Sequence, residues 1–180
     1  MSDVPSESRS IFIAAPLEQV YAFITDVAKL STLSPECVRA EWNAGQSLRV
    51  GATFHGWNRA GDQTWDVDGE VSAVEPNKEF AFRAGTNVLG EHATRWRFVV
   101  EPRQGGTQVT ESYEAPVLAI PDHPVAQIPG RAAALTQGMQ ATLERLKAAM
   151  EGTEQVTWHT GHSINYIVIS EAHHTRKKAG

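Results

Sequence analysis

The sequence contains a single cysteine, Cys37, so no disulfide can form within the chain. It lacks an apolar run near the roughly 20 residues that span a bilayer. Its polar N-terminus has no apolar segment of the kind found in a signal peptide. These absences argue against a disulfide-rich secreted scaffold and against stable membrane insertion. We therefore expect a soluble, cytoplasmic protein whose thiol stays reduced.

Positive charge is scarce as well, because 16 Lys and Arg against 21 Asp and Glu give a formal net charge of −5. The only dense basic cluster is at 176–178, in the C-terminal tail, which argues against a nucleic-acid partner. The chain also lacks HExxH, paired CxxC, Walker, Rossmann and GxSxG patterns. Its seven histidines are dispersed or fall in the tail. We expect no metal and no cofactor.

The sequence does contain a long series of strand patterns, in which apolar and polar residues alternate between turn signals. They predict one strand near the N-terminus, then two short helices, then a meander of antiparallel strands. The clearest pattern is a pair of long strands within 94–115, joined by a glycine turn. The other expected strands cover 8–14, 38–43, 52–59, 63–74 and 79–83, and the short helices begin near Pro16 and Ala28.

A long helix is predicted over about 129–151, after a connector that contains several prolines. Its apolar residues are spaced four, four, three and four apart, so they form one stripe of an amphipathic helix. Gly138 interrupts this helix at a cost of about 1 kcal/mol relative to alanine. We interpret Gly138 either as a tolerated defect or as a close approach to a sheet or ligand. The stripe consists of Leu135, Met139, Leu143, Leu146 and Met150.

Several segments follow one another in an order that is typical of one fold. They are SIFIAAPLEQVYAFITD, GATFHGWNR with the later Trp65, VSAVEPNKEFAFR, and TRWRFVVEP followed by GGTQVTESYE. Over about 8–151 the chain resembles the polyketide cyclase/dehydrase-like branch of the START/Bet v 1-like (SRPBCC) superfamily. The resemblance implies an α+β, helix-grip fold. In that fold a curved antiparallel sheet of about seven strands wraps around a long C-terminal helix, with an apolar cavity between them.

We expect residues 1–151 to form one small-molecule-binding domain and residues 152–180 to form an extension outside the resemblance. The extension contains two short strand patterns, at 155–159 and 163–170. These could pair as a hairpin, dock on a sheet edge, or exchange between the subunits of a homodimer. The extension could also be a tail that is unrelated to the domain.

The alternation, together with the resemblance, predicts which side chains line the concave face. Each aromatic among them could also be ordinary core. Taken together, they are typical of a pocket lined by aromatics with few polar groups. His55 and Trp57 are expected on the other face, as a dimer surface or as ordinary surface residues. The candidate ligand-binding residues are Phe54, Asn58, Trp65, Phe80, Phe82, Trp96, Phe98, Glu111, Tyr113 and, on the long helix, Met139.

Glu111 conflicts with its own strand pattern. If Val109 faces the core, Glu111 does too, and an inward carboxylate is costly unless it is paired, hydrogen-bonded or hydrated. Glu111 could orient a ligand or act as a base. It could equally pair with Asn58, Tyr113 or an arginine and only stabilise the sheet. Asn58 could bind a ligand or cap the turn near Gly61.

Two functions follow from these candidates. The first is a protein that binds a hydrophobic or aromatic small molecule, polyketide- or lipid-like. The second is a cyclase, aromatase or dehydrase with Glu111 and Tyr113 as acid–base groups. The resemblance favours the first, because Leu30 and Leu33 stand where some aromatase/cyclase members have tryptophan. An interaction module, with the extension exchanged between subunits, is a third alternative.

Overall fold

A computed structural model of the chain describes residues 4–85 and 93–152. Seven strands form one antiparallel sheet in the order β1-β7-β6-β5-β4-β3-β2. Consecutive strands from β2 to β7 pair with each other, β1 pairs with β7, and β1 and β2 are the edges. The elements are β1 (Ser6–Ile13), α1 (Leu17–Ile24), α2 (Val27–Ser31), β2 (Cys37–Trp42), β3 (Thr53–Ala60), β4 (Gln63–Glu75), β5 (Glu79–Gly85), β6 (Thr94–Arg103), β7 (Gly106–Glu114), a 3-10 helix (Pro116–Ala119) and α3 (Arg131–Glu151).

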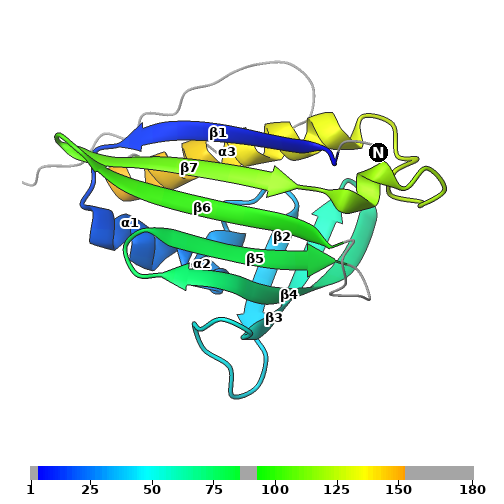
Figure 1. Ribbon diagram of the computed structural model, residues 1–180, viewed down its shortest axis with the longest axis horizontal. Coiled ribbons are helices and arrows are strands. Elements are labelled where there is room, and N and C mark those ends of the chain that lie inside the picture. Colours follow the sequence, from blue (N-terminus) through cyan, green and yellow to red (C-terminus); the bar gives the residue numbers. More distant parts are fainter. Residues whose placement is uncertain (1–3, 86–92, 153–180) are drawn as a thin grey trace, which may run out of the picture.

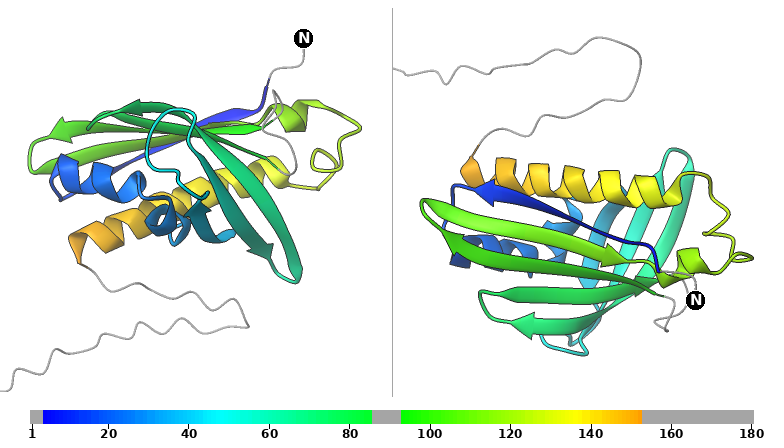
Figure 2. Two further views of the ribbon diagram at one scale, coloured as in Figure 1. Left: turned by 90° about the horizontal axis from the view of Figure 1, so that it is seen from below. Right: turned by 45° about the horizontal axis from the view of Figure 1, so that its top comes forward.

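The sheet curves around α3, and α1 and α2 lie on the same side of the sheet (Figures 1 and 2). This arrangement confirms the helix-grip fold that the resemblance implied. Register shifts in β2, between Cys37 and Arg39, and in β4, between Val71 and Ala73, accompany the curvature. Such bulges bend a strand and increase its twist. The sheet therefore has a concave face that can hold a helix.

Local signals explain where the helices begin and end. The Asp26 side chain accepts hydrogen bonds from the backbone N–H groups of Ala28 (3.1 Å) and Lys29 (3.2 Å), which caps α2. The long helix α3 begins two residues later than the sequence predicts, because Gly130 takes a left-handed conformation with φ of 72°. Gly152, with φ of 71°, ends α3 in the same conformation.

The core fills one end of the space between α3, α1 and the sheet. Its fully buried side chains come from β1, α1, the segment after α2, β4 to β7 and the C-terminal half of α3. They include Ile13, Val20, Ile24, Leu33, Val71, Phe80, Val109, Leu143 and Leu146. The other end, beside the N-terminal half of α3, is not filled in this way, and this difference positions the site.

No helix in the described ranges is both long and apolar enough to cross a membrane. The strand patterns expected at 155–159 and 163–170 lie outside the described residues.

Candidate functional site

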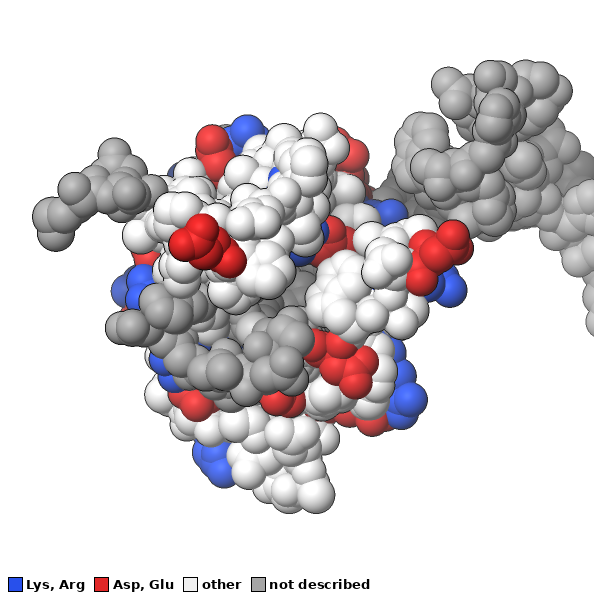
Figure 3. Space-filling model, turned by 90° about the vertical axis from the view of Figure 1, so that its right-hand side faces the viewer, with Lys and Arg blue, Asp and Glu red and all other residues white. Residues whose placement is uncertain are grey.

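A cavity of about 200 Å³ lies between the N-terminal half of α3 and the concave face of the sheet. Its walls come from β2 to β7, from α2 and the loop after it, and from α3. Figure 3 shows the surface hollowed at the end of the molecule where β5 ends and α3 begins, between side chains that are mostly uncharged. A cavity at this place in the fold is what the resemblance implied.

The apolar wall is built around Phe54 in β3. Its ring packs edge-on against Trp42, with centroids 5.9 Å apart, and against Phe82, with centroids 5.5 Å apart. Gly69 is the cross-strand partner of Phe54 in β4. A Cβ atom at Gly69 would lie 2.1 to 2.4 Å from three atoms of the Phe54 ring, so the ring lies where a side chain would otherwise stand. Glycine at position 69 thus fixes one wall of the cavity.

Most of the candidate residues from the sequence meet at this cavity. Phe54, Asn58, Trp65, Phe82, Trp96, Phe98, Glu111 and Met139 all line it. Their positions place them in contact with the cavity; a role in ligand binding stays a prediction.

Phe80 and Tyr113 face inward, as the alternation indicates, but neither lines the cavity. Phe80 is fully buried in the core. Tyr113 packs against Trp96, and its hydroxyl lies 3.3 Å from the carbonyl oxygen of Ala132 and 3.2 Å from Thr136 Oγ1. The Tyr113 hydroxyl therefore ties β7 to the first turns of α3.

Glu111 in β7 is 3% exposed and lines the cavity. Its Oε2 atom is buried and has no hydrogen-bond partner among the described residues. The alternatives in which Glu111 pairs with Asn58, Tyr113 or an arginine are therefore not realised in this structure. Burial raises the pKa of the Glu111 carboxyl well above its ordinary value of 4.5, because the charged form loses its hydration. The uncharged acid is accordingly the favoured form.

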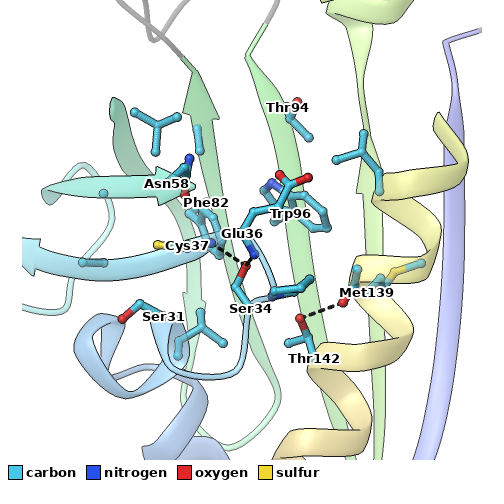
Figure 4. A pocket seen from close by; sticks show the side chains of 18 of the residues that line it. Ser31, Ser34, Glu36, Cys37, Asn58, Phe82, Thr94, Trp96, Met139 and Thr142 are labelled. Atoms are coloured by element: carbon cyan, nitrogen blue, oxygen red, sulfur yellow. Dashed lines mark hydrogen bonds between the residues drawn. The ribbon is translucent and has the colours of Figure 1, made fainter. Parts of the chain in front are cut away.

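An ion pair that the sequence did not indicate closes part of the cavity wall. Arg131, the first residue of α3, donates to both carboxylate oxygens of Glu36, through Nη1 to Oε1 and through Nη2 to Oε2, the latter at 2.9 Å. Ser34 Oγ accepts hydrogen bonds from the backbone N–H groups of Glu36 (3.2 Å) and Cys37 (3.0 Å), which holds the loop in place (Figure 4). The two partners are 95 residues apart, and no local pattern links them.

Other polar side chains of the lining are satisfied by nearby backbone. Ser31 Oγ donates to the Ala28 carbonyl (2.7 Å), and Thr142 Oγ1 donates to the Gly138 carbonyl (2.9 Å). The Cys37 thiol donates to the Arg39 carbonyl at 3.2 Å, and burial raises its pKa. A thiol in this state is a poor nucleophile.

Asn58 and Thr94 differ from these groups. Both line the cavity (Figure 4), and neither side chain forms a hydrogen bond with any residue that the structure describes. Asn58 therefore does not cap the turn near Gly61. Glu111 and the indole N–H groups of Trp65 and Trp96 also line the cavity with hydrogen-bonding capacity that the described chain leaves open.

Gly138 also lines the cavity. A Cβ atom there would lie 3.4 Å from Cγ of Pro35, which is ordinary van der Waals contact. The described chain therefore leaves room for a Cβ atom at position 138, so a close approach to the sheet does not require glycine there. A close approach to a ligand stays a prediction.

The opposite face of the sheet carries His55 and Trp57, as expected. The His55 ring lies between Asp68, with Nδ1 3.0 Å from Oδ1, and Asp66, with Nε2 3.4 Å from Oδ2. The hydrogen bond to Asp68 is the main cause that raises the pKa of His55 above 6.5. Within the described ranges no group of three or more His, Cys, Asp or Glu residues is placed to hold a metal ion.

A curved sheet that grips a long helix and encloses a mostly apolar cavity defines the helix-grip class of proteins. Within that class, the chain belongs to the family described as polyketide cyclase/dehydrase and lipid transport, whose family model matches residues 6–151. The comparison with curated proteins finds no match.

Solved structures agree with this assignment. A Polyketide_cyc-like protein from Corynebacterium glutamicum is 30% identical, with a TM-score of 0.58, over 84% of this chain and 94% of that chain. A protein from Chromobacterium violaceum is 18% identical, with a TM-score of 0.61, over 81% of this chain and 97% of that one. The di-domain ARO/CYC protein StfQ of the steffimycin biosynthetic pathway is 13% identical, with a TM-score of 0.63. That match covers 83% of this chain and 51% of StfQ. The last two similarities concern the fold alone.

Proposed function

We propose that this protein binds a hydrophobic or aromatic small molecule, polyketide- or lipid-like, in the cavity between the sheet and α3. The observation that carries the proposal is the buried Glu111 side chain, which lines a mostly apolar cavity and whose Oε2 atom has no hydrogen-bond partner in the described chain. Leaving a buried polar group unsatisfied costs about 1–3 kcal/mol. A bound molecule that supplies the missing hydrogen bond would remove this cost. The family description, which includes cyclases, dehydrases and lipid transport, supports a ligand in this position.

The size of the cavity supports a small ligand. A cavity of about 150 Å³ holds benzene, so the volume of about 200 Å³ suits one ring or two fused rings. The rings of Phe54, Phe82 and Trp96 would pack against such a body.

Titration with the neutral fluorescent probe N-phenyl-1-naphthylamine tests this function. Ala134 lines the cavity, whereas its neighbour Ala133 does not, and both residues are exposed on α3. We expect Ala134→Trp to weaken probe binding at least tenfold and Ala133→Trp to leave it unchanged, with both variants melting close to the wild type. Absence of probe uptake by the folded wild-type protein, or equal binding by both variants, would contradict the proposal.

An enzyme is the second candidate, supported by the cyclase and dehydrase terms in the family description. Glu111 would be the acid–base group and Asn58 an orienting group. Tyr113 is the weaker acid–base candidate, because its hydroxyl contacts α3 and does not line the cavity. Glu111→Gln should then abolish cyclisation of a poly-β-ketone thioester, followed by ultraviolet absorbance, while binding of the neutral probe persists. Equal turnover by wild type and variant would remove this mechanism.

The proposal also places the protein in the cytoplasm, where its single thiol would stay reduced. Fractionation of cells that express the full chain tests this. Recovery mainly in the membrane or secreted fraction would contradict it.

A further inference from the structure

We propose that the cavity selects an uncharged ligand that presents a hydrogen-bond acceptor, such as a ketone, quinone or ester oxygen, to the carboxylic acid of Glu111. This inference rests on the proposed binding function and names the chemistry of the ligand.

Within residues 4–85 and 93–152, the surroundings of Glu111 offer its carboxyl group no cation. On β1, Arg9 is its cross-strand partner in register, but the Arg9 side chain donates to Glu7 Oε2 (3.1 Å) and to the Ser8 carbonyl (2.7 Å). On α3, Arg131 is held by both oxygens of Glu36. A carboxylate at position 111 would therefore be buried without a counter-charge, which favours the neutral acid.

The other described elements around the cavity add no charge that could change this result. On the β6 side the cross-strand partner of Glu111 is Phe98. The loop after α2 contributes Glu36, which is paired, and β2 contributes Cys37, whose thiol donates to a backbone carbonyl. Next to Glu111 on its own strand, Tyr113 faces α3. The raised pKa of Glu111 agrees with the absence of a cation among these described neighbours.

A neutral carboxylic acid can donate through its O–H group, which a carboxylate cannot do. The Glu111 carboxyl, which lines the cavity and lacks a partner at Oε2 in the described chain, therefore matches an acceptor oxygen on the ligand. Asn58 and Thr94 can each donate or accept, so they add polar contacts without deciding the type of ligand. The indole N–H groups of Trp65 and Trp96 can only donate, so they favour an acceptor as well. Among these lining groups Glu111 is the most deeply buried.

The same charged groups also predict which ligand charge the cavity accepts. With Glu111 protonated and Arg131 paired with Glu36, the part of the lining that the structure describes carries no uncompensated charge of either sign. A charged ligand would lose its hydration on entry and find no free counter-ion among the described lining residues. The cavity therefore favours neutral molecules over anions or cations of the same shape.

Three naphthalenes of similar size separate these properties, measured by displacement of N-phenyl-1-naphthylamine. They are 2-acetylnaphthalene, which carries an acceptor oxygen, 2-isopropylnaphthalene, which does not, and 2-naphthoate, which is an anion. We expect wild type to bind the ketone about tenfold more tightly than the hydrocarbon, the value of one well-placed buried hydrogen bond. The naphthoate should bind most weakly.

Two variants at position 111 test the role of Glu111. Glu111→Leu removes the donor, so ketone and hydrocarbon should bind with equal affinity. Glu111→Gln retains an N–H donor and should keep most of the preference for the ketone. In wild type the ketone should bind more weakly as pH rises through the pKa of Glu111, because the O–H group is lost. The Glu111→Gln variant retains His55 and Cys37, the other groups that could titrate in this range. It should therefore show no such change with pH.

The outcomes distinguish the two proposals. If neither the fluorescent probe nor any naphthalene binds, the binding function fails and this inference fails with it. If the probe binds but wild type holds ketone and hydrocarbon equally, or prefers naphthoate, the binding function stands and the inference is wrong. Retention of the ketone preference in Glu111→Leu would also overturn the inference.

Discussion

Arg9 lies directly opposite Glu111 in the β1–β7 register, yet it donates to Glu7 and to its own strand and not to Glu111. A cross-strand pair of opposite charges would ordinarily stabilise a sheet. Here β1 is an edge strand, and the Arg9 side chain is 40% exposed whereas Glu111 is 3% exposed. The arginine stays hydrated, and the carboxyl group remains alone in the cavity.

The isolation of Glu111 has a consequence for stability against pH. Because its pKa is raised in the folded state, the folded protein holds a proton that the unfolded chain releases above about pH 4.5. Stability therefore falls as pH rises from that value to the raised pKa. We expect Glu111→Gln to match wild type near pH 4 and to exceed it by about 1–3 kcal/mol at pH 8.

Urea denaturation of both proteins at several pH values measures this difference. Glu114→Gln, on the same strand but exposed and paired with Arg95, is the matched control and should show no comparable growth of the difference with pH. If the free energies of unfolding of wild type and Glu111→Gln run parallel across this pH range, Glu111 is ionised in the folded protein and finds a partner.

A second prediction concerns the cavity wall around Phe54. A methyl group at position 69 would overlap the Phe54 ring, so Gly69→Ala should lower the free energy of unfolding by about 1–3 kcal/mol. Adding Phe54→Leu, which removes the ring, should recover part of the loss. A double-mutant cycle by chemical denaturation measures the coupling. Strict additivity of the two changes would show that the ring does not occupy this position.

His55 on the outer face makes a third prediction. Its pKa is raised mainly by the hydrogen bond to Asp68 and to a smaller degree by Asp66. The His55 ring signal, followed by NMR, should therefore titrate above 6.5, and the midpoint should fall further in Asp68→Asn than in Asp66→Asn. Stability from these contacts is present below pH 6.5 and is lost as pH rises through the raised pKa. An equal midpoint in wild type and Asp68→Asn would contradict the assignment.

The sequence predicted the order of the elements. It also predicted the face of the sheet on which each residue lies, because successive side chains of a strand point to opposite faces. It could not separate Phe80 from Phe82, since both face inward. Phe80 is covered by core, whereas Phe82 reaches the cavity. Whether an inward side chain is covered by the core or reaches the cavity depends on how the helices cover the sheet. The Glu36–Arg131 pair was missed for a similar reason, because it joins a loop to a helix start that only the folded chain brings together.

The last prediction concerns the Glu36–Arg131 ion pair and its effect on the charge of the ligand that binds. Both partners line the cavity, so Glu36→Gln would leave the Arg131 guanidinium beside the ligand without its counter-ion. We expect the variant to bind 2-naphthoate at least tenfold more tightly than wild type, because a bidentate arginine–carboxylate contact becomes available. Binding of 2-acetylnaphthalene should change little, and loss of the partly exposed pair should cost about 1 kcal/mol of stability. Glu41→Gln breaks an exposed pair with Arg39 outside the cavity lining and should leave naphthoate binding unchanged. The additional change Arg131→Gln should abolish the gain; a gain that survives it would show that the anion binds elsewhere.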